Sequence, residues 1–418
     1  MFNAQCSMFN KNNIMEQIIK HFTDTDLYKF SMCCAIIDNF PRARVKYEFV
    51  DRNGLRYPEG FGKLVEEQIA MLEDVHITEE EIQYMRHRCY YLPIWFFTYL
   101  RGFRYKKDWA KVHQDEDGQL HIEFEGLWAN TVLLEVQVLA IVSELYYKVT
   151  GLDRHFDYKA YYDKSYAKAQ MMLEHECMWA DFGPRRRASF EAEEVALRAM
   201  VDATNEHQKT GKPGRCTGTS NVYLAMKYNV TPIGTMAHEY ISAIAAMYGP
   251  QMANHIAMST WRHTYRGSLG TYLYDTYKWD AFDRNLSEDF ARGFAGLRVD
   301  SGENYEQFEK MKAKYATFGI PIAEKQVVFS NALDIPRACD LQDRLGHQAK
   351  ISFGIGTCWT NDFEGVEPMN IVIKLLAAKI TEMWPFYNDT CKLSEDKGKA
   401  TGRPDVVKRY KEILHIEE

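Results

Sequence analysis

Apolar side chains recur at helical spacing through much of the first 150 residues. This spacing covers residues 25–37 and 61–75, and Thr78-Glu-Glu-Glu81 predicts a capping box that opens a further helix. Residues 127–149 predict one long buried helix, because few polar positions interrupt them and Gly151 follows. These helices are one part of a mixed first third of the chain.

The same region also contains strand signals. Residues 45–50 alternate apolar and polar side chains, and Asn53-Gly54 supplies a turn after them. Residues 111–124 predict a hairpin, since Asp117-Gly118 separates two short alternating runs. Together with the helices, these strands predict an α+β N-terminal domain with an antiparallel sheet over residues 1–150, which part of 370–418 completes.

The rhythm changes from about residue 175. Short apolar runs end in small or charged residues, and most lead into a helix-like stretch. Six such strand–loop–helix units favour an irregular (β/α) barrel over residues 151–369, with a doubly wound open sheet as the alternative. The predicted strands are residues 177–180, 231–235, 269–274, 296–299, 326–329 and 350–353.

The residues that follow these strands carry most of the chemistry in the sequence. A barrel places its site at the carboxyl ends of its strands, so we expect these side chains to lie close together. They combine anion-binding groups, carboxylates and one imidazole, which suits a sugar phosphate with a magnesium-bound diphosphate. They are Arg185 to Arg187, Thr235, His238, Asp275, Arg298, Asp300, Ser301, Gly302, Ser330, Gly354, Gly356 and Thr357.

Composition narrows the class of protein. With 418 residues, 46% of them hydrophobic and 26% charged, the chain has the composition of a folded protein of about two to three domains. The formal charge of −7 argues against a nucleic-acid or membrane-surface binder. No apolar stretch reaches the ~20 residues of a spanning helix, and Met1 to Phe22 contains no apolar block typical of a signal peptide. Nine scattered cysteines without a Cys-x-x-Cys pair predict reduced thiols in a cytoplasmic protein.

Two motifs are typical of phosphate binding. Arg185-Arg-Arg187 precedes a helix, where guanidinium groups and free N–H groups attract phosphate, although the three side chains could instead pair with nearby glutamates. Gly354-Ile-Gly-Thr357 follows a strand and allows close backbone approach to an anion, although it could be a plain turn. No Walker sequence occurs, so an ATP site here is not a P-loop.

Two further groups concern catalysis. Arg298 and Asp300 lie on the same side of a predicted strand, and the pair could grip a carboxylated ligand or form a strand-end ion pair. His238 offers an imidazole that can carry a phosphoryl group transiently, although lone histidines are more often structural. No second histidine stands at the spacing of a zinc protease.

Taken together, these segments resemble the nicotinate phosphoribosyltransferase family. The matching segments occur in the family's order from residue 25 to about residue 400 and include Lys392-Leu-Ser394. The others are Thr25-Asp-Leu-Tyr-Lys29, Asp181-Phe-Gly-Pro-Arg-Arg-Arg187, Gly218-Thr-Ser-Asn221, Gly234-Thr-Met-Ala-His-Glu239, Asp275-Thr-Tyr-Lys278, Gly296-Leu-Arg-Val-Asp-Ser-Gly302, Phe329-Ser-Asn-Ala-Leu-Asp334 and Ser352-Phe-Gly-Ile-Gly-Thr357.

The resemblance implies an ATP-coupled ligase of NAD salvage. It would join nicotinate to 5-phosphoribosyl 1-diphosphate with Mg²⁺, forming nicotinate mononucleotide and diphosphate through transient phosphorylation of His238. Asp275 and Asp300 would flank His238, and these two carboxylates are also the candidates for a metal contact. The fold implied is a type II phosphoribosyltransferase, an irregular α/β barrel joined to an α+β domain.

The resemblance also assigns roles to the remaining site residues. Phe182 and Tyr28 would cover the two faces of the pyridine ring, with Tyr28 coming from the same chain or from the second subunit of a homodimer. Thr235, Arg298 and Ser220 would contact nicotinate. Phosphate contacts would come from Arg185, Ser301, Gly302, Gly354, Gly356 and Thr357.

Ser220 distinguishes this chain from nicotinamide phosphoribosyltransferase, the close alternative. That enzyme carries an aspartate after the Gly-Thr pair, and an aspartate would repel the carboxylate of nicotinate. Two departures from the family pattern, Glu303 and Asn331, put metal or ribose contacts at those positions in doubt. A phosphosugar lyase or isomerase, and a non-catalytic metabolite-binding homologue, are the more distant alternatives.

Overall fold

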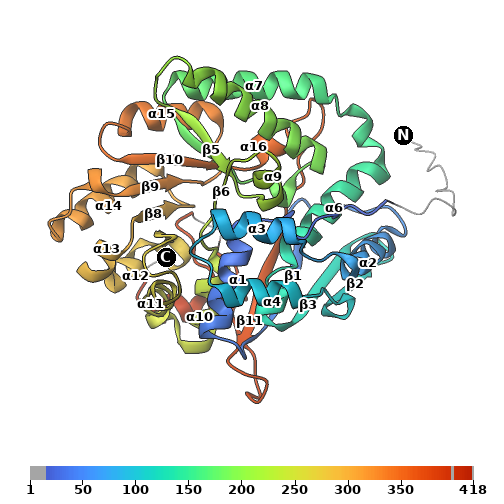
Figure 1. The fold of residues 1–418 in the computed structure, drawn as a ribbon. Helices are drawn as coiled ribbons and strands as arrows, with labels where there is room; N and C mark the ends of the chain where they lie inside the picture. Colours follow the sequence, from blue (N-terminus) through green and yellow to red (C-terminus); the bar gives the residue numbers. More distant parts are fainter. Residues whose placement is uncertain (1–15, 397–399, 417–418) are drawn as a thin grey trace.

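The structure is a computed structural model that describes residues 16–396 and 400–416. Residues 1–15, which form most of the segment examined for a signal peptide, lie outside this range. Figure 1 shows two sheets, with the antiparallel strands β1, β3 and β11 in the lower half and β8, β9 and β10 at the upper left. Helix α1 (Leu27–Asn39) lies between them and packs against α5 and α11.

The first sheet is antiparallel, as the alternating pattern predicts. Its strand order is β12-β11-β1-β3-β2, and β1 pairs with both β3 and β11. Two of its five strands therefore come from the C-terminal part of the chain. The strands are β1 (Arg44–Asp51), β2 (Ala110–Gln114), β3 (Leu120–Leu127), β11 (Ile371–Lys379) and β12 (Asn388–Asp389).

The helices around this sheet confirm most of the predicted pattern. Thr78 and Glu81 form the expected capping box, in which each side chain accepts a hydrogen bond from the other's backbone N–H. The single helix predicted over 127–149 is wrong, because the chain turns at residues 132–134 and separates α5 from α6. The helices here are α2 (Phe61–Met71), α3 (Glu79–Arg88), α4 (Ile94–Gly102), α5 (Trp128–Thr131) and α6 (Glu135–Thr150).

The second sheet is parallel and curled, in the order β6-β5-β4-β10-β9-β8-β7. The predicted α/β class is confirmed. However, no hydrogen bonds among the described residues join the edge strands β6 and β7, so the barrel is open there. The strands are β4 (Met178–Asp181), β5 (Arg215–Thr219), β6 (Thr231–Pro232), β7 (Thr271–Leu273), β8 (Gly296–Val299), β9 (Gln326–Phe329) and β10 (Lys350–Ile355).

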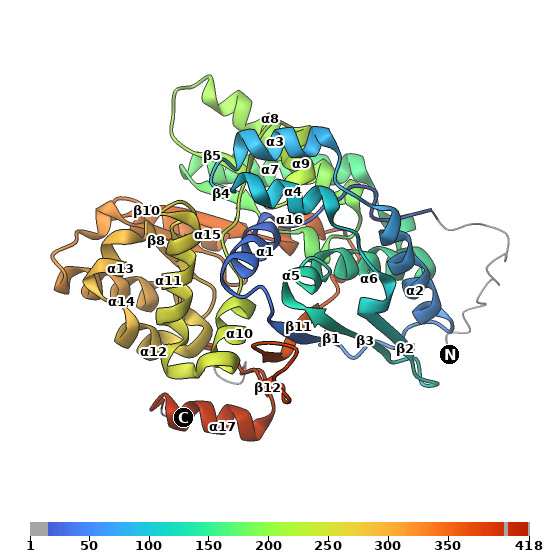
Figure 2. The ribbon, with the colours of Figure 1, turned by 60° about the horizontal axis from the view of Figure 1, so that its bottom comes forward.

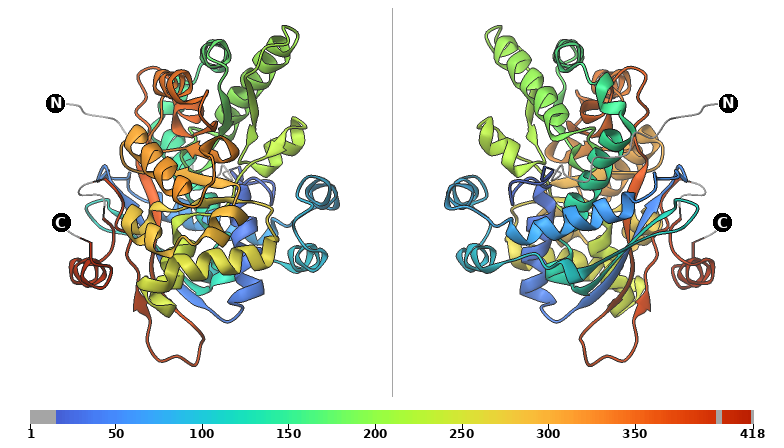
Figure 3. Two further views of the ribbon diagram at one scale, coloured as in Figure 1. Left: turned by 90° about the vertical axis from the view of Figure 1, so that its left-hand side faces the viewer. Right: turned by 90° about the vertical axis from the view of Figure 1, so that its right-hand side faces the viewer.

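Helices connect these strands, as the strand–loop–helix rhythm predicts. Figure 2 shows α17 at the edge of the molecule, below α10 and β12. In the side views of Figure 3, α3 and α4 stand out from the body, and the connection between β11 and β12 projects beyond it. The helices are α7 (Tyr158–Glu174), α8 (Phe190–Gln208), α9 (Val222–Lys227), α10 (His238–Tyr248), α11 (Ala253–Tyr265), α12 (Lys278–Asn285), α13 (Glu288–Gly293), α14 (Asn304–Thr317), α15 (Ile335–Leu345), α16 (Thr357–Thr360) and α17 (Pro404–Ile413).

β5 was not among the predicted strands. Its sequence, Arg215-Cys-Thr-Gly-Thr219, lacks the apolar run that marks the other strands, yet it pairs with β4 along its length. The eight cysteines within the described residues are all free, as predicted. Within the same residues, no helix is long and apolar enough to cross a membrane.

Candidate active site

A cavity of about 660 Å³ lies at the carboxyl ends of the parallel strands, where the barrel pattern predicts the site. Loops after β1, β4, β5, β9 and β10 contribute to its wall, together with the start of α1 and the segment before β11. Its lining includes Asp26, Tyr28, Arg52, Phe182, Arg185, Arg186, Ser220, Arg298, Asp300, Ser330, Asn331, Gly354, Gly356, Thr357 and Met369.

The ring of Phe182 lies directly on the backbone of Gly354. β4 and β10 pair through Ala180 and Gly354, and Phe182 N donates to Ile355 O at 2.9 Å. A β carbon at Gly354 would come within 2.3 Å of the ring, which no real contact allows. Glycine at this position therefore lets an aromatic ring lie flat against the cavity wall. Gly356 is similarly close, because a β carbon there would meet Phe182 O at 2.8 Å.

Three guanidinium groups gather at one side of the cavity. Arg52 follows β1, whereas Arg185 and Arg186 follow β4, and all three line the wall. Burial, with the neighbouring Arg185 and Arg52, lowers the pKa of Arg186 to about 10. Burial and Arg185 likewise lower the pKa of Arg52. Together these groups concentrate positive charge at the wall, which attracts phosphate.

Arg187 does not belong to this anion-binding group. Its fully buried guanidinium contacts Asp24, Glu144 and Glu193 at 2.6, 2.9 and 3.1 Å. The three-arginine motif therefore divides, because Arg187 pairs only internally, whereas Arg185 and Arg186 line the cavity and Arg185 Nη1 also lies 3.2 Å from the buried Glu135. Glu193 is one of the glutamates that the alternative interpretation of the motif proposed as partners.

Arg298 is held in place beside the Phe182 ring. Its Nε donates to Ser330 Oγ at 2.7 Å and its Nη2 donates to Asp300 Oδ1 at 2.8 Å. The guanidinium carbon lies 5.4 Å from the centre of the Phe182 ring. Burial opposes ionisation of Asp300, but Arg298 and His238 outweigh it and hold the pKa of that carboxyl well below its usual range. A charged Asp300 thus fixes Arg298 at the cavity wall.

His238 begins α10 and is surrounded by polar groups. Its Nδ1 lies 3.0 Å from Thr276 Oγ1, and its Nε2 lies 3.0 Å from Asp300 Oδ2 and 2.9 Å from Lys392 Nζ. Asp275 Oδ1 lies 3.9 Å from the same Nε2. Burial and Lys392 lower the pKa of His238, although both carboxylates act in the opposite direction. The imidazole is therefore neutral near pH 7, and its side chain is 19% exposed.

A C-terminal strap, residues 392–396, crosses the barrel end beside His238. Leu393 N donates to Thr276 O at 2.9 Å, and Glu395 N donates to Ser301 Oγ at 3.1 Å. The Ser301 hydroxyl itself donates to Asp275 Oδ2. Ser301 is buried beneath the strap, so its hydroxyl does not reach the cavity.

Gly302 is also covered by the strap. Its N–H donates to Asp396 Oδ1 at 3.0 Å, which places a carboxylate where the sequence predicts a phosphate oxygen. Asn331 supports the same loop, because its Nδ2 donates to Gly302 O at 2.8 Å. Glu303 turns away: its carboxylate caps α14 through Tyr305 N and pairs with Arg337.

The predicted residues thus form two neighbouring groups joined by Asp300. Thr235 belongs to neither group. Its carbonyl oxygen accepts a hydrogen bond from Ser31 Oγ at 2.6 Å. The predicted residues around His238 and the strap are Asp275, Ser301 and Gly302. Those that line the cavity are Tyr28, Phe182, Arg185, Ser220, Arg298, Asp300, Gly354, Gly356 and Thr357.

The sequence interpretation missed several residues of this region. Lys392 stood in a matching segment, but nothing in the sequence linked it to His238, 154 positions away. Asp26 lies in the cavity wall, and burial raises the pKa of its carboxyl while Arg185 opposes the rise. Arg52 follows the first strand, where only an Asn-Gly turn was expected.

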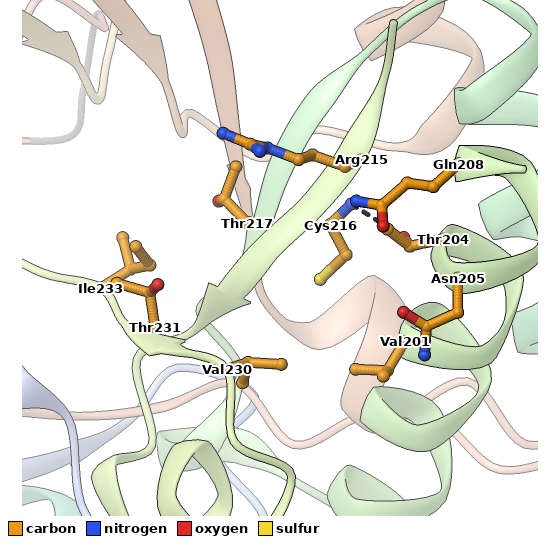
Figure 4. A pocket seen from close by; sticks show the side chains of 10 residues that line it. All are labelled: Val201, Thr204, Asn205, Gln208, Arg215, Cys216, Thr217, Val230, Thr231 and Ile233. Carbon is orange, nitrogen blue, oxygen red and sulfur yellow. Dashed lines mark hydrogen bonds between the residues drawn. The ribbon is translucent and has the colours of Figure 1, made fainter. Parts of the chain in front are cut away.

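A second hollow, of about 450 Å³, lies between α8, β5 and β6 (Figure 4). Figure 4 shows Cys216 and Arg215 on β5, with Thr204 and Asn205 on α8. The described residues that line it include one cation and neither a carboxylate nor an imidazole. None of the predicted site residues lines this hollow.

The described residues contain no group of three or more His, Cys, Asp or Glu side chains that could hold a metal ion. Asp300 uses both carboxylate oxygens for Arg298, Ser330 and His238. Asp275 Oδ1 has no hydrogen-bond partner in the described chain, but a single oxygen does not make a site.

The fold is a curled parallel sheet, and the cavity at its strand ends combines the Phe182 ring with clustered guanidinium groups. A neutral histidine lies beside this cavity. These features define an α/β protein with a site suited to anions. A sequence model described as the nicotinate phosphoribosyltransferase (NAPRTase) family matches residues 177–418. A second, for the N-terminal domain of the same family, matches residues 23–143. The chain belongs to the nicotinate phosphoribosyltransferase family.

Individual relatives extend over nearly the whole chain. It is 34% identical to a probable nicotinate phosphoribosyltransferase from Schizosaccharomyces pombe, covering 96% of this chain and 98% of the relative. It is 36% identical to nicotinate phosphoribosyltransferase 1 of Pseudomonas aeruginosa, covering 96% and 97%. The crystal structure of nicotinate phosphoribosyltransferase from Porphyromonas gingivalis superposes with a TM-score of 0.91 at 37% identity, covering 96% of this chain and 100% of that one.

Proposed function

We propose that this protein joins nicotinate to 5-phospho-α-D-ribose 1-diphosphate, releasing diphosphate and forming nicotinate mononucleotide. One observation carries the proposal: the cavity wall holds an aromatic ring next to a fixed cation. The ring of Phe182 lies on the backbone of Gly354, and the guanidinium group of Arg298 lies beside that ring. A flat pyridine ring with one carboxylate matches both features. Family membership supports the same substrate.

Arg298 is suited to the carboxylate of nicotinate. Its Nε and Nη2 bind Ser330 and Asp300, which leaves Nη1 without a hydrogen-bond partner among the described residues. The two fixed contacts hold the guanidinium plane, so little side-chain entropy is lost when a carboxylate binds. Tyr28 lines the same cavity from α1 of the same chain and would cover the other face of the ring.

The arginines after β4 are suited to the phosphates. Departure of diphosphate leaves positive charge on the ribose carbon, and catalysis requires that the leaving group be stabilised while the ring nitrogen is held in line. Arg185 and Arg186, with Arg52, concentrate positive charge at the cavity. Mg²⁺ would arrive as part of the diphosphate substrate. The loop of Gly354, Gly356 and Thr357 would bind the 5-phosphate.

ATP coupling through His238 is the second part of the proposal. A neutral imidazole next to charged groups can accept a phosphoryl group, and phosphorylation adds about 1.5 to 2 negative charges. Asp300 joins His238 to Arg298, so charge at the histidine would be felt at the nicotinate site. Hydrolysis of this phosphate once per cycle would draw a near-balanced reaction toward the nucleotide.

The alternatives find less support in this cavity. An aldolase that forms a Schiff base needs a lysine, and the described lining contains four arginines but no lysine. The nicotinamide enzyme would carry an aspartate at position 220, where this chain has a serine that does not repel a carboxylate.

The test is an assay with nicotinate or nicotinamide, phosphoribosyl diphosphate and Mg²⁺, with and without ATP. We expect nicotinate mononucleotide, and a higher yield when ATP is present. Product that forms with nicotinamide but not with nicotinate would overturn the substrate assignment. Equal yields with and without ATP would remove the coupling and leave the transferase activity in place.

A further inference from the structure

Two groups of opposite character contact the same nitrogen of His238. Asp300 Oδ2 lies 3.0 Å from Nε2 and can only accept a hydrogen bond when ionised. Lys392 Nζ lies 2.9 Å from Nε2 and can only donate one. Because Nε2 carries either a proton or a lone pair, it satisfies one of these neighbours at a time.

The ammonium group favours the lone pair. A protonated Nε2, in either the imidazolium ion or the Nε2–H tautomer, would place an N–H donor against the three donors of Lys392. If Lys392 keeps Nε2 unprotonated, the neutral ring carries its proton on Nδ1, and Thr276 Oγ1, 3.0 Å away, can accept a hydrogen bond from it. The charged side chains that face the ring are Asp275, Asp300 and Lys392.

The backbone fixes Lys392 at this position. Its N–H donates to Thr401 O at 3.0 Å and its carbonyl accepts from Thr401 N at 2.8 Å. The next residue, Leu393, donates to the carbonyl of Thr276, whose hydroxyl contacts His238 Nδ1. One residue therefore connects the far side of the imidazole to the strap that carries the lysine.

We propose that Lys392 is a positioning residue for His238, which keeps Nε2 unprotonated as a phosphoryl acceptor and then pairs with the phosphate formed there. The proposal rests on the ATP coupling in the proposed function. The Nε2 lone pair forms a bond to the γ-phosphorus of ATP, the bond to the bridging β–γ oxygen breaks, and ADP leaves with that electron pair. Nδ1 keeps its proton, which stays hydrogen-bonded to Thr276 Oγ1.

The first experiment reads the tautomer directly. Long-range ¹H–¹⁵N spectra of the full chain with labelled histidine, assigned with His238→Ala, report which ring nitrogen is protonated. We expect protonated Nδ1 and bare Nε2 in the native protein, and a shift toward protonated Nε2, facing Asp300, in Lys392→Met. A protonated Nε2 in the native protein, or an unchanged signature in Lys392→Met, would overturn the proposal.

The second experiment measures labelling of His238 by γ-labelled ATP. We expect Lys392→Met to slow labelling by at least about tenfold, as for loss of one preorganised charge, and Lys392→Arg to restore most of it. Lys408→Met removes an exposed lysine on α17 and serves as the charge control, with labelling unchanged. Equal rates in Lys392→Met and the native chain would overturn the role.

The two readouts separate this proposal from the function on which it rests. A native chain that takes no label would remove the phosphohistidine step, while the spectra would still show whether Lys392 sets the tautomer. A Lys392→Met chain with a normal tautomer but slow labelling would make the lysine a phosphate contact alone. That result would contradict the positioning role.

Discussion

Gly354 and Phe182 are in direct contact, with the aromatic ring lying where any larger residue at position 354 would place its β carbon. The relationship explains why a glycine stands next to the last residue of β10. It also means that the loop which the sequence assigned to phosphate binding shapes the pyridine site as well.

Gly354→Ala should therefore weaken nicotinate binding. The added methyl group would push the Phe182 ring off the wall, and we expect KM for nicotinate to rise about tenfold, the cost of a lost ring contact. Gly102→Ala is the matched control, because a β carbon there meets nothing within 4 Å. Steady-state kinetics of both variants test this, and an unchanged KM in Gly354→Ala would show that the ring is not a substrate contact.

Arg298→Ala should affect nicotinate far more than ATP. Loss of a charge-assisted hydrogen bond costs about 1.5–3 kcal/mol, or roughly tenfold to a hundredfold in KM for nicotinate. We expect a smaller rise in KM for ATP, because Arg298 reaches His238 only through Asp300. Arg409→Ala, on α17, controls for removal of a positive charge. A KM for nicotinate that matches the native value would place the carboxylate elsewhere.

His238→Ala should abolish phosphoryl labelling. With γ-labelled ATP we expect an acid-labile and base-stable label on the native chain, the stability pattern of phosphohistidine. His76→Ala, which removes an exposed imidazole, should label normally. Label that persists in His238→Ala would assign the acceptor to another residue.

Asp181→Asn should change how stability depends on pH. Burial raises the pKa of Asp181 from 3.8 to about 7, so across that interval the folded chain holds a proton that the unfolded chain has released. Its contribution to stability is therefore greatest at acidic pH and declines as pH approaches 7. An asparagine side chain has nearly the same shape as aspartate but does not ionise in this pH range.

We expect the free energy of unfolding of Asp181→Asn, relative to the native chain, to rise between pH 4 and 7 by on the order of 2 kcal/mol. Urea unfolding at both pH values measures it. Asp117→Asn, in an exposed turn, is the control. Parallel pH profiles for the native and Asp181→Asn chains would show that Asp181 ionises normally.

Pattern alone located β1, the β2–β3 hairpin and six of the seven parallel strands, because apolar runs mark buried strands wherever they are long enough. It failed for β5, whose buried positions are small or polar residues between Arg215 and Thr219. It also failed at residues 132–134, where no glycine or proline signals the break between α5 and α6. In both places tertiary packing, rather than local preference, decides the structure.

The candidate site was predictable where a residue follows a strand. The different positions of the three consecutive arginines could not be predicted. Only the folded chain shows that Arg187 pairs with Asp24 while Arg185 lines the cavity. Ser301 and Gly302 follow β8 as expected, but the strap covers them. Lys392 could not be connected with His238 because chain separation carries no distance information.

The fold returns α1 to the mouth of its own barrel, so Tyr28 and Phe182 border a single hollow within one polypeptide. All the groups assigned to the reaction are consequently inherited together on each copy. A change in α1 and a change after β4 therefore alter the same hollow of the same copy.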